Sequence, residues 1–314
     1  MIDPYSLKIQ AENKEKRLPG FWKCLLGFGD KERSIEKIAE LYIRAGNCYS
    51  VNKNSVVKTD SYRDSIEAIE CYQRAINCYN KIPNGLYDYD CVGIFEKMAR
   101  VSESSDDAIF YYKQAIVYCE KDSGSNFIKR EQIFSKLAGI YEGLKDYTNA
   151  LKYTEYSVRM IEARAMADLN KASLVDKYCK KGKFELYLNH LDESIKNFEL
   201  ANDTDDRTFT GEYLYCVILL RFLQLANTTF VDLVQDMNDI LENDATQLFM
   251  RSGYYREIQR IIDCIGDGDY EQLASMRPTV QSSIYFRNKE ITEVSNYIIT
   301  SLSTILKNRA LDLT

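Results

Sequence analysis

Apolar and small residues recur along the chain with the spacing of helix faces, and the same arrangement returns about every forty residues. In the first copy, Ala68 and Ile69 are followed by Tyr72 and then by Ala75 and Ile76. Related groups begin at residues 108, 150 and 194, so successive starts lie 40, 42 and 44 residues apart. Residues at i, i+4 and i+7 share one face, because a helix turns every 3.6 residues. The pattern predicts a solenoid of helix pairs, in which small residues allow close approach and rings fill the gaps.

Similar apolar stripes predict a partner for each of these helices. The stripe through Ile35, Tyr42 and Tyr49 predicts a helix that begins at an N-cap Ser34, and a short charged helix precedes it at residues 7–18. Further partner helices are expected near residues 91–101, 129–143, 169–179 and 210–225.

The repeat becomes blurred from residue 229 onward, where helices are expected at 230–242, at 246–264, from Asp269 and at 289–307. We expect them to form a C-terminal bundle that covers the open end of the solenoid, because an uncapped end exposes apolar surface. The predicted organisation is helical hairpins over 1–228, a bundle over 229–308 and a mobile tail over 309–314.

A loop predicted at residues 20–30 departs from the helical pattern, since bulky apolar side chains alternate there with glycines. It contains the only tryptophan of the chain. Residues 8–33 carry seven basic and four acidic side chains, a local charge of +3 on a chain of −6. An apolar finger inside a basic collar favours anionic lipid, at about 1 kcal/mol per basic residue. The alternative is a loop folded back on the first helix pair. The apolar residues of the finger are Phe21, Trp22, Leu25, Leu26 and Phe28.

Composition gives little indication of chemistry. The acidic net charge of −6 argues against nucleic acid as a partner. Nine scattered cysteines without a C-x-x-C pair indicate reduced thiols in a cytosolic protein. His190 is the only histidine and is expected to be solvated, so no histidine-rich metal site is possible. No phosphate-binding loop and no G-x-S-x-G motif occur. We therefore expect no enzyme activity, no catalytic residue, no metal and no cofactor.

Basic side chains gather on two of the predicted helices. They either form solvated faces or line a concave surface for an acidic partner, and helical spacing alone leaves both open. The residues are Lys129, Arg130 and Lys136, then Lys171, Lys177, Lys180, Lys181 and Lys183.

Several segments, taken in order, resemble the alpha-type soluble NSF attachment proteins, the SNAP adaptors of SNARE disassembly. They are Leu25 to Gly29, Ile35 to Tyr49 with its Arg44-Ala45-Gly46-Asn47 core, Leu137 to Glu142, Asp192 to Glu199, and Asp312 to Thr314. The resemblance implies a twisted sheet of helical hairpins with a C-terminal bundle. It also implies binding to a SNARE four-helix bundle with syntaxin-like partners, and recruitment and stimulation of the NSF-type AAA ATPase.

The same resemblance implies roles for particular residues. The apolar finger is the membrane loop, and Lys171 contacts the SNARE bundle. Lys129 and Arg130 stand in for a family lysine that falls near Gln132. By the same resemblance, Asp263 and Asp267 are the carboxylates of the bundle that face NSF. Leu313 is the penultimate leucine that stimulates ATP hydrolysis. The acidic run that usually precedes the final Asp-Leu is missing.

The sequence therefore predicts an all-α fold: a right-handed solenoid of tetratricopeptide-like hairpins with a C-terminal bundle. The predicted function is a cytoplasmic SNARE–NSF adaptor in vesicle trafficking and membrane fusion, bound weakly and reversibly to membranes. One alternative is a tetratricopeptide co-chaperone that clamps the C-terminal carboxylate of a peptide, or another protein-interaction scaffold. The period of 40 to 44 exceeds the usual 34 of the tetratricopeptide repeat. An enzyme with an unrecognised site is the third possibility.

Overall fold

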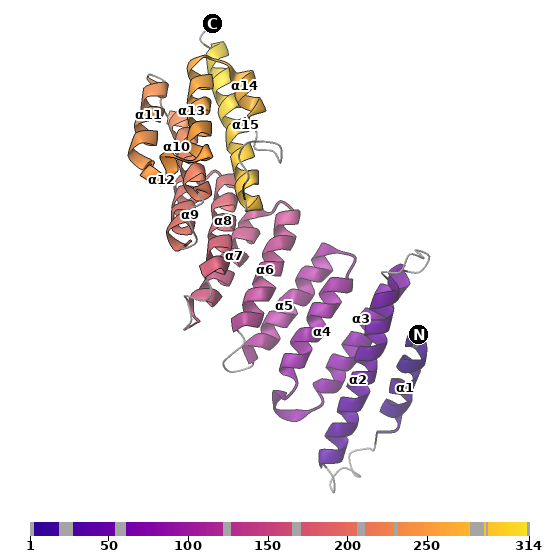
Figure 1. The fold of residues 1–314 in the computed structure, drawn as a ribbon. Helices are drawn as coiled ribbons and strands as arrows, with labels where there is room; N and C mark the ends of the chain where they lie inside the picture. Colours follow the sequence, from indigo (N-terminus) through magenta and orange to yellow (C-terminus); the bar gives the residue numbers. More distant parts are fainter. Residues whose placement is uncertain are drawn as a thin grey trace. The chain divides into compact units, whose positions relative to one another are not determined.

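The described part of the chain is entirely helical (Figure 1). The computed structural model describes residues 3–18, 28–53, 61–121, 127–164, 171–205, 211–228, 232–276, 286 and 288–312. Within these ranges there are fifteen α-helices, one 3₁₀ turn (η2, Pro83–Gly85) and no strand. Neighbouring helices pack in pairs, as in a tetratricopeptide-like solenoid, so the predicted all-α fold is confirmed. None of the described helices is long and apolar enough to cross a membrane.

The chain divides into two compact units, residues 1–140 and 141–314, called here the N-terminal and C-terminal units. The helices are α1 (Pro4–Lys16), α2 (Phe28–Lys53), α3 (Ser61–Tyr79), α4 (Asp88–Val101), α5 (Ser105–Lys121), α6 (Phe127–Gly143), α7 (Tyr147–Glu162), α8 (Lys171–Tyr187), α9 (Leu191–Thr204), α10 (Glu212–Thr228), α11 (Leu233–Asp244), α12 (Gln247–Met250), α13 (Gly253–Gly266), α14 (Tyr270–Ser275) and α15 (Lys289–Asp312).

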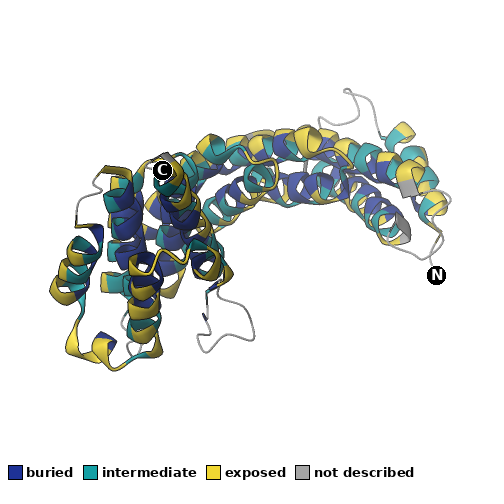
Figure 2. Ribbon diagram, turned by 90° about the horizontal axis from the view of Figure 1, so that it is seen from above, coloured by how far each residue is buried: buried dark blue, intermediate teal, exposed yellow. Residues whose placement is uncertain are grey.

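In the N-terminal unit, α2 packs against α3 and α4 packs against α5. The repeat residues of α3 face this contact, since Ala68, Tyr72 and Ala75 are all buried. Figure 2 shows buried positions on the faces where helices meet and exposed positions on the outer faces. The sequence period therefore marks the packed face of each helix, as predicted.

Rings fill the gaps between paired helices by lying directly on glycine. A Cβ added to Gly46 of α2 would lie 2.6 Å from Cε1 of Tyr72 on α3. The C-terminal unit repeats the arrangement, since a Cβ on Gly182 of α8 would lie 2.6 Å from Cε2 of Phe198 on α9. Both rings are almost completely buried. The helices of each pair approach this closely because the glycine has no side chain.

Ion pairs attach the charged helix α1 to α3. Lys8 lies 2.7 Å from Glu67 and 2.9 Å from Glu70. A second pair joins Arg74 of α3 to Glu12 at 2.9 Å. Only Leu7 and Ala11 of α1 are buried, so charge contributes much of the contact.

The C-terminal unit has one continuous core around α10. This helix packs against α9, α11, α13 and α15. The core runs from Val175 of α8 to Leu306 of α15 and crosses residue 228, where the sequence predicts the boundary of the C-terminal bundle.

Three predicted boundaries differ from the structure. α2 begins at Phe28, so residues 28–30 are helical and Ser34 lies inside the helix, not at its N-cap. Asp30 and Glu32 fall in the first turns, where acidic residues favour a helix N-terminus. The single helix predicted over 246–264 is broken at Ser252, whose side chain caps α13. α15 continues to Asp312, so residues 309–312 of the predicted mobile tail are helical.

The packing of Tyr72 on Gly46 predicts opposite effects for two glycine substitutions in the N-terminal unit. Gly46→Ala should lower the free energy of unfolding by roughly 1–3 kcal/mol, because the new methyl group overlaps the buried ring. Gly93→Ala in α4 meets no atom within 4 Å and should raise it by up to about 1 kcal/mol through helix propensity. Urea denaturation of both variants measures the difference. Equal effects would show that the ring does not require the glycine.

Candidate functional site: a basic pocket in the N-terminal unit

Most residues of the predicted membrane loop lie outside the described part of the chain. Phe21, Trp22, Leu25 and Leu26 belong to this group. Phe28 is the first residue of α2, so its prediction as a loop residue is wrong. The apolar finger itself stays a prediction.

Two of the predicted SNARE-binding residues are engaged within the N-terminal unit. Lys129 of α6 forms an ion pair with Glu96 of α4, which Lys136 also contacts at 2.8 Å. Glu96 is only 2% exposed, and burial alone would raise its pKa. Hydrogen bonds from the two lysines outweigh burial and lower the pKa, so the carboxylate stays charged. Arg130 lies 3.4 Å from Glu120. Lys129 thus neutralises a buried charge between α4 and α6.

The third predicted SNARE contact, Lys171, begins α8 and is half-buried in the C-terminal unit. Of the predicted NSF contacts, Asp263 is exposed in the last turn of α13 and Asp267 is exposed at its C-cap. Leu313 lies outside the described residues. His190 directly precedes α9 and its side chain is 60% exposed, as expected from the sequence.

Lys183 is buried, whereas the sequence left open a solvated position for it. Its side chain is 1% exposed and forms ion pairs with Glu142, Glu290 and Glu293, the last at 3.0 Å. Burial alone would lower the pKa of Lys183, but the hydrogen bonds to the glutamates raise it above its ordinary value. The three carboxylates lie close enough to hold a metal ion, yet the Lys183 ammonium already occupies the position among them. The cluster joins α8 to α6 and to the start of α15.

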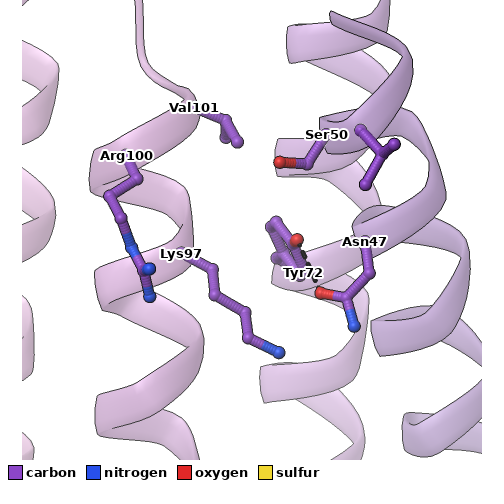
Figure 3. A pocket seen from close by; sticks show the side chains of 7 residues that line it. Asn47, Ser50, Tyr72, Lys97, Arg100 and Val101 are labelled. Atoms are coloured by element: carbon purple, nitrogen blue, oxygen red, sulfur yellow. Dashed lines mark hydrogen bonds between the residues drawn. The ribbon is translucent and has the colours of Figure 1, made fainter. Parts of the chain in front are cut away.

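A pocket of about 540 Å³ opens between α2, α3 and α4 of the N-terminal unit (Figure 3). Helix α4 contributes two cations: Lys97 extends toward α2 and α3, and Arg100 lies along α4. The remaining lining residues are Asn47, Ser50, Val51, Tyr72 and Val101.

The two cations of this pocket have no acidic partner. Among the described residues, no carboxylate lies within ion-pair distance of Lys97 or Arg100. Burial and the nearby Arg100 charge lower the pKa of Lys97, in contrast to Lys183. Arg100 is exposed and donates from Nε to the Glu96 carbonyl at 3.3 Å. Its place in the last turn of α4 suits a cation, because the helix dipole is negative there.

Tyr72 organises the polar wall opposite these cations. Its hydroxyl donates to Oδ1 of Asn47 at 3.0 Å and hydrogen-bonds with Ser50. Burial raises the pKa of Tyr72 to about 12, so the phenol stays neutral. The Lys97 ammonium lies 6.0 Å from the centre of the Tyr72 ring. The amide N–H groups of Asn47 remain as donors, so lining residues of both walls carry hydrogen-bond donors.

The sequence interpretation did not single out Lys97 and Arg100. A signal was present, since the two cations stand three residues apart and therefore share a helix face. Asn47 lies in the Arg44-Ala45-Gly46-Asn47 segment that was noted for its family resemblance. What the sequence alone could not supply is that Asn47 of α2 and Lys97 of α4, fifty residues apart, line the same pocket.

Comparison with known proteins supports a helical-repeat protein and goes no further. No family model matches the chain. In an alignment of 236 positions that covers 68% of the chain, it is 24% identical to the TPR repeat-containing protein MJ1428 of Methanocaldococcus jannaschii. It spans only 38% of that relative. This similarity agrees with the tetratricopeptide-like fold, and it gives no support to the SNAP resemblance in particular.

The Lys183 cluster generates a stability prediction with a defined pH dependence. Lys183→Met should cost about 3–5 kcal/mol at pH 7, because three carboxylates lose their buried cation. Lys180→Met is the matched control and should cost less than about 0.5 kcal/mol, since Lys180 forms only a surface pair with Asp176 at 3.7 Å.

The defect of Lys183→Met should shrink in acid. Hydrogen bonds from Lys183 and Lys289 overcome burial and lower the pKa of Glu293 in the folded protein. This stabilisation is therefore present above the unfolded pKa of about 4.3 and is lost as the pH falls below it. The variant lacks this stabilisation, so its free energy of unfolding falls less in acid than that of the unsubstituted protein. Urea denaturation at pH 7 and pH 4 measures the gap, and a gap that widens in acid would contradict the assignment.

Proposed function

We propose that this protein is a helical-repeat scaffold that binds an acidic segment of another protein in the basic pocket and carries out no chemistry of its own. The observation that carries the proposal is the pair of cations, Lys97 and Arg100, without a carboxylate partner among the described residues. Elsewhere in the same unit, the buried charge of Glu96 is neutralised by two lysines. A binding partner that supplies negative charge would balance the pocket in the same way.

The chemistry of the pocket suits a carboxylate-rich segment. Lys97 offers an ammonium and Arg100 a guanidinium, which are the usual donors to acidic groups. Asn47 adds an amide donor from the opposite wall. The helical-repeat fold and the similarity to a TPR repeat-containing protein favour a protein ligand, because such repeats present extended binding surfaces. This proposal is closest to the peptide-clamping alternative predicted from the sequence.

A SNARE–NSF adaptor is a narrower proposal for the same scaffold. The exposed Asp263 and Asp267, four residues apart at the end of α13, favour it, since they form an accessible acidic surface. The ion pair of Lys129 with Glu96 argues against Lys129 as a primary SNARE contact. Peripheral membrane binding through Phe21 and Trp22 belongs to this narrower proposal.

The scaffold proposal predicts that an acidic peptide binds through Lys97 and Arg100. A fluorescent decapeptide of alternating Glu and Ser with a free C-terminus is the probe, and fluorescence anisotropy at 0.1 M salt gives the affinity. The double variant Lys97→Met and Arg100→Gln should weaken binding at least about tenfold, because each charge-assisted hydrogen bond contributes about 1.5–3 kcal/mol.

The matched control is a double variant that removes the same amount of positive charge from positions outside the pocket. Lys113→Met with Arg63→Gln removes one lysine and one arginine from exposed positions of α5 and α3 in the same unit. It should leave the affinity within about twofold, since exposed charges outside the pocket are screened by salt. Equal weakening in both double variants would mean that net charge, not the pocket, binds the peptide.

The narrower proposal predicts ATP-dependent disassembly of a preformed SNARE complex by NSF only when this protein is present. Leu313→Ala should slow disassembly and leave SNARE binding unchanged, if the penultimate leucine acts on the ATPase. Phe21→Ser with Trp22→Ser should lower activity on liposome-borne SNAREs and spare soluble ones. Absence of both disassembly and SNARE binding would reject the adaptor and leave the acidic-peptide scaffold.

A further inference from the structure

The charge and the donors of the basic pocket identify its ligand more closely. Resting on the proposed function, we propose that the pocket receives the phosphate of a phosphorylated serine or threonine in the bound segment. The argument starts from the charge balance. Lys97 and Arg100 contribute two positive charges, whereas none of the lining residues is acidic. A carboxylate brings one negative charge, while a phosphoserine brings about 1.5 to 2 near pH 7.

The lowered pKa of Lys97 supports the same conclusion. Burial and the repulsion from Arg100 both disfavour its charged form. A dianion between the two cations would remove this repulsion, and a monoanion would remove only part of it. Lys183 shows the contrasting case in this chain, since its glutamates raise its pKa. The pocket therefore lacks about as much negative charge as one phosphate supplies.

The hydrogen-bond donors of the pocket also fit a ligand group that only accepts hydrogen bonds. Asn47 Oδ1 accepts the Tyr72 hydroxyl proton, so the N–H groups of this lining side chain remain as donors. Figure 3 shows the Lys97 side chain extending from α4 toward α2 and α3. Arg100 keeps its two terminal nitrogens after its Nε bond to Glu96. Two walls, α2 and α4, thus offer donors to the three terminal oxygens of a phosphate.

The size of the pocket favours a phosphate carried by a peptide. Its volume of about 540 Å³ is larger than a free phosphate ion requires and lies in the range of small-molecule sites. Val51 and Val101 lie at its edge and provide apolar contact for residues next to the phosphorylated one. A phosphorylated side chain with its flanking residues uses both the charged and the apolar parts.

The test compares one peptide sequence in four forms: with serine, phosphoserine or glutamate at the centre and an amidated C-terminus, and with serine and a free C-terminus. We expect the phosphoserine form to bind at least about tenfold more tightly than the others. Lys97→Met or Arg100→Gln should remove this advantage, while Lys113→Met should retain it. Inorganic phosphate at millimolar concentration should compete.

The pH dependence gives a readout that a carboxylate ligand does not share. The second pKa of a phosphate is about 6, so the phosphoserine form should lose affinity between pH 7 and pH 5 as the ligand becomes a monoanion. The groups facing the ligand from the three helices are Lys97 and Arg100 of α4, Tyr72 of α3, and Asn47 and Ser50 of α2. Burial raises the pKa of Tyr72 to about 12, so the phenol stays neutral throughout this range.

The outcomes separate the phosphate inference from the proposed function. Equal binding of the serine peptide with a free C-terminus, lost in Lys97→Met, would overturn the phosphate ligand and keep the acidic-segment scaffold. Absence of binding by all four peptides and by the Glu-Ser decapeptide would overturn both. Tighter binding to vesicles with 5% phosphatidylinositol phosphate than to the phosphopeptide would assign the phosphate site to lipid and overturn the peptide source.

Discussion

Aromatic rings that lie on glycine backbone set the distance between paired helices, and the candidate site depends on this contact. Tyr72 occupies the space left by Gly46, and Phe198 does the same above Gly182. Because the Tyr72 ring is held between α2 and α3, its hydroxyl reaches Asn47 at the base of the pocket. The residue that spaces the helices thus also orients a donor of the site. A substitution that loosens the packing of this ring would disturb the pocket without touching a cation.

Adjacent residues of α4 lie in different surroundings because of the geometry of the helix: Glu96 is paired within the unit and Lys97 lines the pocket. Glu96 and Lys97 point about 100° apart, because a helix has 3.6 residues per turn. Glu96 is turned toward α6, where Lys129 and Lys136 neutralise it. Lys97 is turned toward α2 and α3, where no carboxylate lines the pocket. The unit tolerates uncompensated charge only where solvent reaches it, since a buried unpaired charge is strongly destabilising.

The sequence was sufficient to predict which face of each helix is packed, but not which charged side chains form ion pairs. The spacing of Ala68, Tyr72 and Ala75 already places them on one face, and all three are buried. Lys180 and Lys183, in contrast, belong to one basic run, but Lys180 is 31% exposed and Lys183 only 1%. The acidic partners of Lys183 come from other helices, which the sequence pattern does not reveal. The basic pocket was missed for the same reason, since Lys97 and Asn47 come together only once α2, α3 and α4 have packed. The start of α2 was misplaced because glycines near Phe28 suggested a loop, and the following acidic residues favour a helix.

The long repeat period does not distinguish between the possible partners, because helix length accounts for it. A period of 40 to 44 exceeds the usual tetratricopeptide repeat of 34 by six to ten residues. The structure has helices of 19 residues in α3 and 17 in α5, α6 and α8, so the extra residues extend helices within the repeat. Three to five added residues lengthen each helix by about 5–8 Å and leave the ring-on-glycine contact unchanged. The period that argued against a peptide-clamping repeat is therefore compatible with one. In the proposed scaffold, charge at the pocket wall, and not the length of the repeat, would select the partner.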